Sequence, residues 1–172
     1  MIKLAGSLLI VGATSWLGFL KADQLIQRTK QLQQLQIAFQ ALEAEIMYAA
    51  VPLPEAMGKV GNKVDSPAAD FFLVSKEKLK SEIGITARQA WQEAVEEVFP
   101  NTALMIEDKE FLLNFGNNLG NSDRTHQEKN LQLVQKELKQ AKEASVTAKK
   151  SGVKKWRYFG ILGGLLIVIL LY

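Results

Sequence analysis

The chain of 172 residues has no cysteine and only one histidine, His126. The absence of cysteine excludes disulfides, thiol nucleophiles and cysteine-ligated metal sites, and it fits a reducing compartment. A single histidine near a predicted helix start is a weak ligand candidate, so we expect His126 to lie on the surface. No serine, histidine and carboxylate set occurs in a recognisable motif. We therefore expect no catalytic residue, no cofactor and no metal site.

The chain also lacks a large excess of charge of either sign. It contains 21 basic and 18 acidic residues, and residues 21–157 hold all of these except Lys3, which leaves that segment a net charge of +2. The sequence pI of about 9.0 comes largely from basic residues at 149–157. Such a cluster beside an apolar run indicates a membrane surface as the partner rather than nucleic acid.

Two long apolar runs occupy the ends of the chain, at residues 4–20 and 158–172, and neither contains a charged residue. Crossing a hydrocarbon core of about 30 Å takes roughly 17–25 apolar helical residues. At 1.5 Å per residue, the two runs reach about 26 Å and 22 Å. Basic and aromatic flanking residues can extend both. We predict transmembrane helices at residues 1–20 and 158–172, with a polar domain at residues 21–157 between them.

The basic residues also predict an orientation, because Lys and Arg near membrane spans stay on the cytoplasmic side. Lys21, Arg28 and Lys30 follow the first run, and five basic residues precede the second. We therefore expect the polar domain to be cytoplasmic. The alternative for the N-terminus is a signal peptide, because residues 11–13 form a small-residue cleavage site. In that case the protein is a membrane-anchored structural protein exposed outside the cytoplasm.

The polar domain shows helical periodicity and no stretch of strand alternation. Apolar residues recur at alternating spacings of three and four along residues 25–49 and 131–152, which is typical of a helix packed along a partner helix. Prolines, Thr86 and Gly120 mark the ends of shorter helices between these two. We predict an all-α fold, a cytoplasmic bundle of about six helices in which both transmembrane helices continue into long antiparallel bundle helices. The aromatic residues expected in its core are Phe71, Phe72, Trp91, Phe99, Phe111 and Phe115.

Two clusters of polar residues resemble known sites but lack an essential part of each. Residues 58–63 resemble a phosphate-binding loop, but they lack its Gly-Lys-Ser/Thr ending and no strand precedes them. Glu93 and Glu97 share a helix face, as metal-binding carboxylates do in helical bundles, but no Glu-x-x-His motif accompanies them. We expect a solvated surface at both places. A metal-dependent bundle enzyme that uses Glu93 and Glu97 is the alternative function.

Small residues in the two apolar runs have the spacing of helix-packing motifs. Gly160 and Gly164 form a G-x-x-x-G pair in the second run, and Ser7, Thr14 and Gly18 form a stripe on the first. Small side chains let helices in a membrane approach closely. The two runs are therefore expected either to pack on each other or, in addition, to dock other membrane subunits.

Several short motifs follow one another in a familiar order across the chain. They are Leu42-Glu43-Ala44-Glu45-Ile46-Met47-Tyr48 followed by Pro52-Leu53, then Ala90-Trp91, Phe115-Gly116, Leu119-Gly120, and Asp123-Arg124 with Gln127. In order and spacing, and over essentially the whole chain, they resemble the stage III sporulation protein AB family of endospore-forming bacteria.

This resemblance implies a function and a location. Members of this family have a helical domain similar to the cytoplasmic domains of the inner-membrane platform protein of type II secretion. The resemblance implies a non-enzymatic subunit of the channel complex that joins mother cell and forespore, on the mother-cell side of the outer forespore membrane. It also implies other proteins of the same operon as partners, above all the stage III sporulation AA ATPase, for which the protein is expected to be a platform or adaptor.

The polar residues within the matching motifs are the candidates for a partner surface. Helical packing alone accepts many substitutes for Glu43, Glu45, Asp123 and Arg124, so we expect these four to contact the ATPase. The alternative role of Asp123 is to cap the helix that follows it. A second copy of the chain, in a homo-oligomer, is a further candidate partner.

Overall fold

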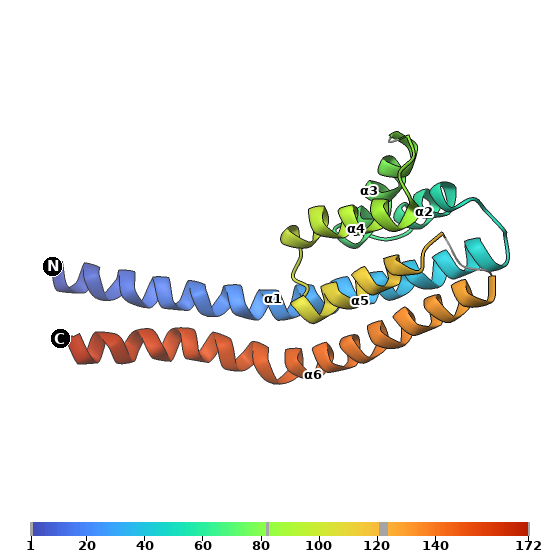
Figure 1. The fold of residues 1–172 in the computed structure, drawn as a ribbon. Helices are drawn as coiled ribbons and strands as arrows, with labels where there is room; N and C mark the ends of the chain where they lie inside the picture. The colour runs from blue at the N-terminus through green and yellow to red at the C-terminus, as the bar shows by residue number, and fades with distance from the viewer. Residues whose placement is uncertain (1, 82, 121–123, 172) are drawn as a thin grey trace. The chain divides into compact units, whose positions relative to one another are not determined.

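The computed structural model describes residues 2–81, 83–120 and 124–171, with the side chains of 2–5 and 124 left out. Figure 1 shows that the fold is helical, and no strand occurs in the described ranges. This confirms the predicted helical architecture. The elements in chain order are α1 (Ile2–Met47), α2 (Leu53–Gly61), α3 (Ala68–Ser81), α4 (Ala87–Val98), the 3₁₀ helix η1 (Phe99–Asn101), α5 (Ile106–Asn117) and α6 (Arg124–Leu171).

The predicted transmembrane helices at residues 1–20 and 158–172 are wrong. Within the described residues, no helix combines the length and the apolar character that crossing a membrane requires. The first apolar run contains Ser7, Thr14, Ser15 and several glycines, which lower its hydropathy. The second has only 15 residues, and lengthening it toward the roughly 17–25 that a span needs brings in charged residues such as Arg157.

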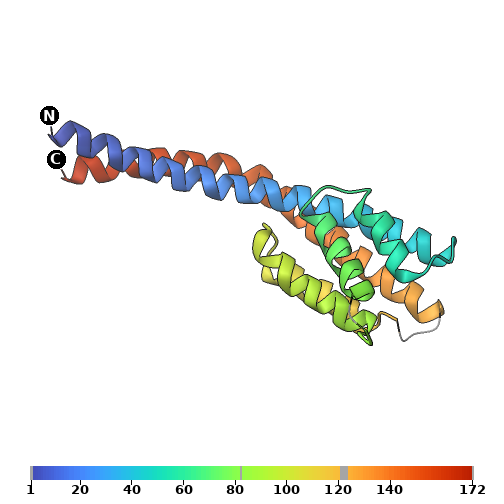
Figure 2. The same ribbon diagram turned by 90° about the horizontal axis from the view of Figure 1, so that it is seen from above.

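The chain forms two compact units, to both of which α1 and α6 contribute. Unit 1 comprises residues 1–29 and 144–172, and unit 2 comprises residues 30–143. Within unit 2, Gln135 Nε2 donates to the Glu43 carboxylate over 2.8 Å and Lys142 Nζ donates to Gln36 Oε1 over 2.6 Å. Residue numbers thus rise along α1 as they fall along α6, so the two helices are antiparallel there (Figures 1 and 2).

Aromatic side chains from four helices form the centre of unit 2. Phe39 of α1 lies edge-to-face against Phe72 of α3, Trp91 of α4 and Phe115 of α5, with ring centroids 4.9 to 5.8 Å apart. This geometry favours aromatic pairs beyond the area that they bury. Five of the six aromatic residues predicted to be in the core are buried, and Phe99 is half-buried. The helices α3, α4 and α5 are therefore held to α1 through a shared aromatic cluster.

Local sequence signals explain where the short helices begin and end. Thr86 caps α4 as predicted, because its hydroxyl accepts from Gln89 N while its own N–H donates to the Gln89 side chain. Gly120 has φ of +86°, the left-handed conformation predicted for it. The helix α5 begins at Ile106. There the Asp108 carboxylate accepts from Met105 N over 2.8 Å and so satisfies the first turn of α5.

Candidate functional site

Glu45, a predicted partner-binding residue, lies near the C-terminal end of α1 and forms ion pairs with α2. Its carboxylate lies 2.9 Å from Lys59 Nζ and 3.3 Å from Lys63 Nζ, and only 13% of its side chain is exposed. The hydrogen bond from Lys59 holds the pKa of this carboxyl below its ordinary value of 4.5, although desolvation opposes the shift. Glu45 therefore fastens α2 to α1. These ion pairs involve Lys59 and Lys63, the two lysines of the segment at residues 58–63 that resembles a phosphate-binding loop.

Glu43, the second predicted residue on α1, faces α6 instead. Its half-buried carboxylate accepts a hydrogen bond from Gln135. Of the other two predicted residues, Asp123 lies outside the described residues, and Arg124 is the first residue of α6 with its side chain outside them. The structure thus places Glu43 and Glu45 against different helices of their own chain, and binding to a partner stays a prediction for all four.

The carboxylates proposed for the alternative metal site are held by a lysine. Lys78 Nζ of α3 lies 3.2 Å from the Glu93 carboxylate and 3.4 Å from that of Glu97. The hydrogen bond to Glu93 is the main cause that raises the pKa of Lys78 above its ordinary value of 10.5. Within residues 2–81, 83–120 and 124–171, no three His, Asp or Glu side chains gather as a metal ion would require. His126 is exposed near the start of α6.

Small residues bring the backbones of α1 and α6 together in unit 1. A Cβ atom added to Gly18 would lie 2.5 Å from the Trp156 carbonyl oxygen and 3.0 Å from Gly160 Cα. One added to Gly160 would lie 2.9 Å from the Thr14 carbonyl oxygen, and one added to Gly164 would clash with the Thr14 hydroxyl. The predicted packing residues Thr14, Gly18, Gly160 and Gly164 are therefore all at one helix contact.

A buried hydroxyl pair extends this contact toward residue 29. Thr29 Oγ1 and Ser145 Oγ lie 2.8 Å apart, and both side chains are buried. The Thr29 hydroxyl also donates to the Leu25 carbonyl oxygen over 2.9 Å, so the Ser145 hydroxyl is the donor between the two. A Cβ atom at Gly152 would lie 2.6 Å from a methyl group of Leu25. The alternating spacing along residues 131–152 includes Ser145 and Gly152, but it does not identify Thr29 as the partner of Ser145.

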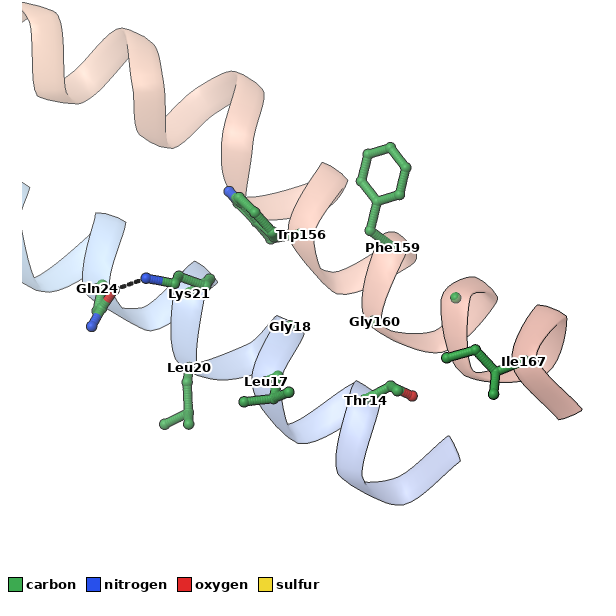
Figure 3. Close-up of a pocket in the computed structure, with 11 residues that line it drawn as sticks. Thr14, Leu17, Gly18, Leu20, Lys21, Gln24, Trp156, Phe159, Gly160 and Ile167 are labelled. Carbon is green, nitrogen blue, oxygen red and sulfur yellow. Dashed lines mark hydrogen bonds between the residues drawn. The ribbon is translucent and has the colours of Figure 1, made fainter. Parts of the chain in front are cut away.

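Two apolar grooves lie along the contact between α1 and α6 in unit 1. The first, with a volume of about 470 Å³, includes Gly18, Gly160 and Gly163, and Figure 3 shows Lys21 and Trp156 toward one end of it. The second, of about 560 Å³, includes Gly12 and the predicted packing residue Ser7. Both volumes fall in the range of about 300–1,000 Å³ that is usual for small-molecule sites.

Most of the large apolar side chains that are exposed in the described residues belong to unit 1. Leu8 is 78% exposed, and Ile169 and Leu170 are each 77% exposed. Contiguous exposed apolar surface on this scale usually marks a site that contacts a membrane or another protein. The remaining members of this exposed apolar surface are Leu9, Trp16, Leu17, Phe19, Leu20, Trp156, Tyr158, Phe159, Ile161, Leu162, Leu165, Leu166, Ile167 and Leu171.

Comparison with known proteins identifies the family. The family model described as stage III sporulation protein AB matches residues 3–172. Stage III sporulation protein AB of Bacillus subtilis (strain 168) is 33% identical over 171 residues, which is 99% of each chain. A solved structure of a stage III sporulation protein AB superposes with a TM-score of 0.69 at 30% identity, and covers 73% of this chain and 98% of that one. The chain therefore belongs to the stage III sporulation protein AB family.

Proposed function

We propose that this protein is a non-enzymatic adaptor in the stage III sporulation complex between mother cell and forespore. In this proposal unit 1 associates with the mother-cell side of the outer forespore membrane, and unit 2 binds the stage III sporulation AA ATPase. The proposal rests on the difference between the surface of unit 1 and the surface of unit 2. Unit 1 exposes apolar and basic side chains, whereas unit 2 closes around an aromatic core and exposes mainly polar ones.

Charge supports the membrane association of unit 1. Residues 6–29 and 144–171 contain seven basic residues and one acidic residue, a net charge of +6. A Lys or Arg near an anionic bilayer contributes about 1 kcal/mol of attraction. The exposed apolar side chains of the same unit add the hydrophobic contribution. The expected membrane is therefore one that carries anionic lipids.

The non-enzymatic role is supported by the names of the family and the relative and by the ion pairs that the candidate carboxylates form. The matching family and relative carry sporulation names and no enzymatic name. Glu93 and Glu97 share one lysine, and Glu45 pairs with two, so these carboxylates contribute to the packing of the bundle. A closed helical bundle with a polar surface suits docking of a soluble partner.

Binding of the purified ATPase to purified full-length protein tests the adaptor role. The informative variant combines Glu43→Lys with Glu45→Gln. Gln135 can turn its amide to accept a hydrogen bond from an ammonium at position 43, and a glutamine at position 45 avoids placing a third lysine beside Lys59 and Lys63. We expect about tenfold weaker ATPase binding, equivalent to about 1.4 kcal/mol.

Glu110→Lys is the matched control, because Glu110 is an exposed acidic residue on α5 outside the predicted partner surface. It should bind the ATPase as the wild type does, and circular dichroism should show that all variants keep their helices. If the double variant bound the ATPase with wild-type affinity, Glu43 and Glu45 would not belong to the interface. A wild-type protein that does not bind the ATPase would refute the adaptor role itself.

A further inference from the structure

The first groove of unit 1 contains a glycine that the contact between α1 and α6 does not require. A Cβ atom added at Gly18, Gly160 or Gly164 would meet the opposite helix, whereas one added at Gly163 would meet nothing within 4 Å. Glycine inside a helix costs about 1 kcal/mol relative to alanine. Gly163 bears this cost without serving the helix contact. Its effect is to keep the groove open.

The groove is lined mostly by apolar residues, and the charged residue Lys21 lies toward one end. Figure 3 shows Leu17, Phe159 and Ile167 along it, and Lys21 toward the end nearer Trp156. Lys21 Nζ donates to Gln24 Oε1 over 3.2 Å, so the ammonium is held at that end. A mostly apolar groove with a few polar groups at a fixed position is typical of a small-molecule site.

These features together select an elongated apolar ligand with a negative group at one terminus. The net charge of +6 over residues 6–29 and 144–171 of unit 1 favours an anion, and Lys21 places positive charge toward one end of the groove. The second groove provides the contrast. It is apolar and has a similar volume, but none of the described residues that line it is basic.

We propose that the first groove holds one acyl chain of an anionic phospholipid, with the phosphate at Lys21. This inference rests on the proposed membrane association and deepens it, because it assigns the lipid class and the residues that select it. The acyl chain lies over Gly163 between α1 and α6, and the phosphate accepts hydrogen bonds from the Lys21 ammonium. A zwitterionic lipid occupies the groove less well, because its choline or ethanolamine group reduces the net negative charge near Lys21.

Quenching of Trp156 fluorescence by brominated acyl chains tests this directly, because Trp156 lines the groove. The full-length protein would carry Trp16→Phe to remove the other exposed tryptophan of unit 1, and Trp91 is fully buried within unit 2. Phosphatidylcholine vesicles with a minor fraction of brominated phosphatidylglycerol would be compared with phosphatidylcholine vesicles holding brominated phosphatidylcholine at the same fraction. The brominated anionic lipid should quench more strongly.

Two pairs of variants separate the groove from the rest of unit 1. Gly163→Leu fills the first groove, and Gly12→Leu places the same side chain in the second, where an added Cβ also meets nothing within 4 Å. Lys21→Gln removes the charge at the groove, and Lys155→Gln removes an exposed lysine of α6 outside it. We expect Gly163→Leu to abolish the preferential quenching and Lys21→Gln to reduce the lipid preference about fivefold, equivalent to roughly 1 kcal/mol. The two controls should behave as the wild type does.

Each other outcome overturns the inference in a distinguishable way. Equal effects of Gly163→Leu and Gly12→Leu, with vesicle binding intact, would refute the lipid site and leave membrane association standing. A wild-type protein that binds no vesicles would refute the association as well. A third outcome is that the wild type shows no preferential quenching and that Gly163→Leu no longer self-associates. That outcome would refute the lipid site and assign the groove to a helix of a second copy.

Discussion

The substitution Gly116→Ala tests how the aromatic core of unit 2 is fitted to α5. Trp91 Nε1 donates to the Leu112 carbonyl oxygen over 2.6 Å, so the indole lies along α5, and Gly116 is one helical turn further on. A Cβ atom at Gly116 would lie 2.5 Å from Trp91 Cδ1 and 3.4 Å from Cγ. The indole cannot move away freely, because Phe39, Phe72 and Phe115 surround it.

The size of the effect follows from a comparison with a second glycine. Extra volume in a well-packed core typically costs about 1–3 kcal/mol. The three atoms nearest to a Cβ atom at Gly58 in α2 all belong to the flexible Lys76 side chain, and the nearest, Cδ, would lie 3.0 Å away. Both changes to alanine gain about 1 kcal/mol of helix propensity, so their difference isolates the packing penalty. We expect Gly116→Ala to be less stable than Gly58→Ala by about 1–3 kcal/mol.

Thermal and urea unfolding, followed by circular dichroism, measure this difference. One kcal/mol corresponds to roughly 2–4 °C in Tm for a chain of this size, so Gly116→Ala should melt several degrees below Gly58→Ala. The Tm of Gly58→Ala should equal or exceed that of the wild type. If the two variants melted together, the tight fit of Trp91 against Gly116 would be wrong.

Three further predictions concern single contacts. Thr86→Ala removes the capping box with Gln89 and should lower the free energy of unfolding by about 0.5–2 kcal/mol in urea titrations, and an unchanged midpoint would contradict the capping role. Asn130→Ala removes the hydrogen bond to the Phe115 carbonyl oxygen (2.9 Å) and should cost about 1 kcal/mol, whereas wild-type stability would show that the bond contributes nothing. Lys59 lowers the pKa of Glu45 in the folded state. The stability advantage of the wild type over Glu45→Gln should therefore be full above about pH 5 and lost as pH falls through the folded pKa. An advantage that does not change with pH would contradict this.

Features set by neighbouring residues were predictable from the sequence. The helices of unit 2, the Thr86 cap and the left-handed Gly120 all depend on side chains within a few positions of one another. The membrane spans were wrong for a related reason. A run without charges is not sufficient for a span, because its serine, threonine and glycine content and the charges just beyond it decide whether the whole segment is apolar enough.

Contacts between distant segments were not predictable from spacing. The sequence predicts Glu45 at a partner surface, and only the fold shows that Lys59 of α2 and Lys63, just after α2, reach its carboxylate. The glycines of α6 are different, because their spacing was informative. Gly160 and Gly164 face α1 as the G-x-x-x-G spacing predicts, and Gly163 does not. A spacing of four keeps residues on one helix face, whereas the neighbours Gly163 and Gly164 are about 100° apart.

Flotation of the purified stage III sporulation AA ATPase with anionic vesicles, in the presence and absence of this protein, tests the adaptor role most directly. The proposed role requires the ATPase to float with the vesicles only when the wild-type protein is present, and less so with the Glu43→Lys, Glu45→Gln variant. An ATPase that stayed in the soluble fraction beside vesicle-bound wild-type protein, or that floated equally without it, would contradict the proposed function.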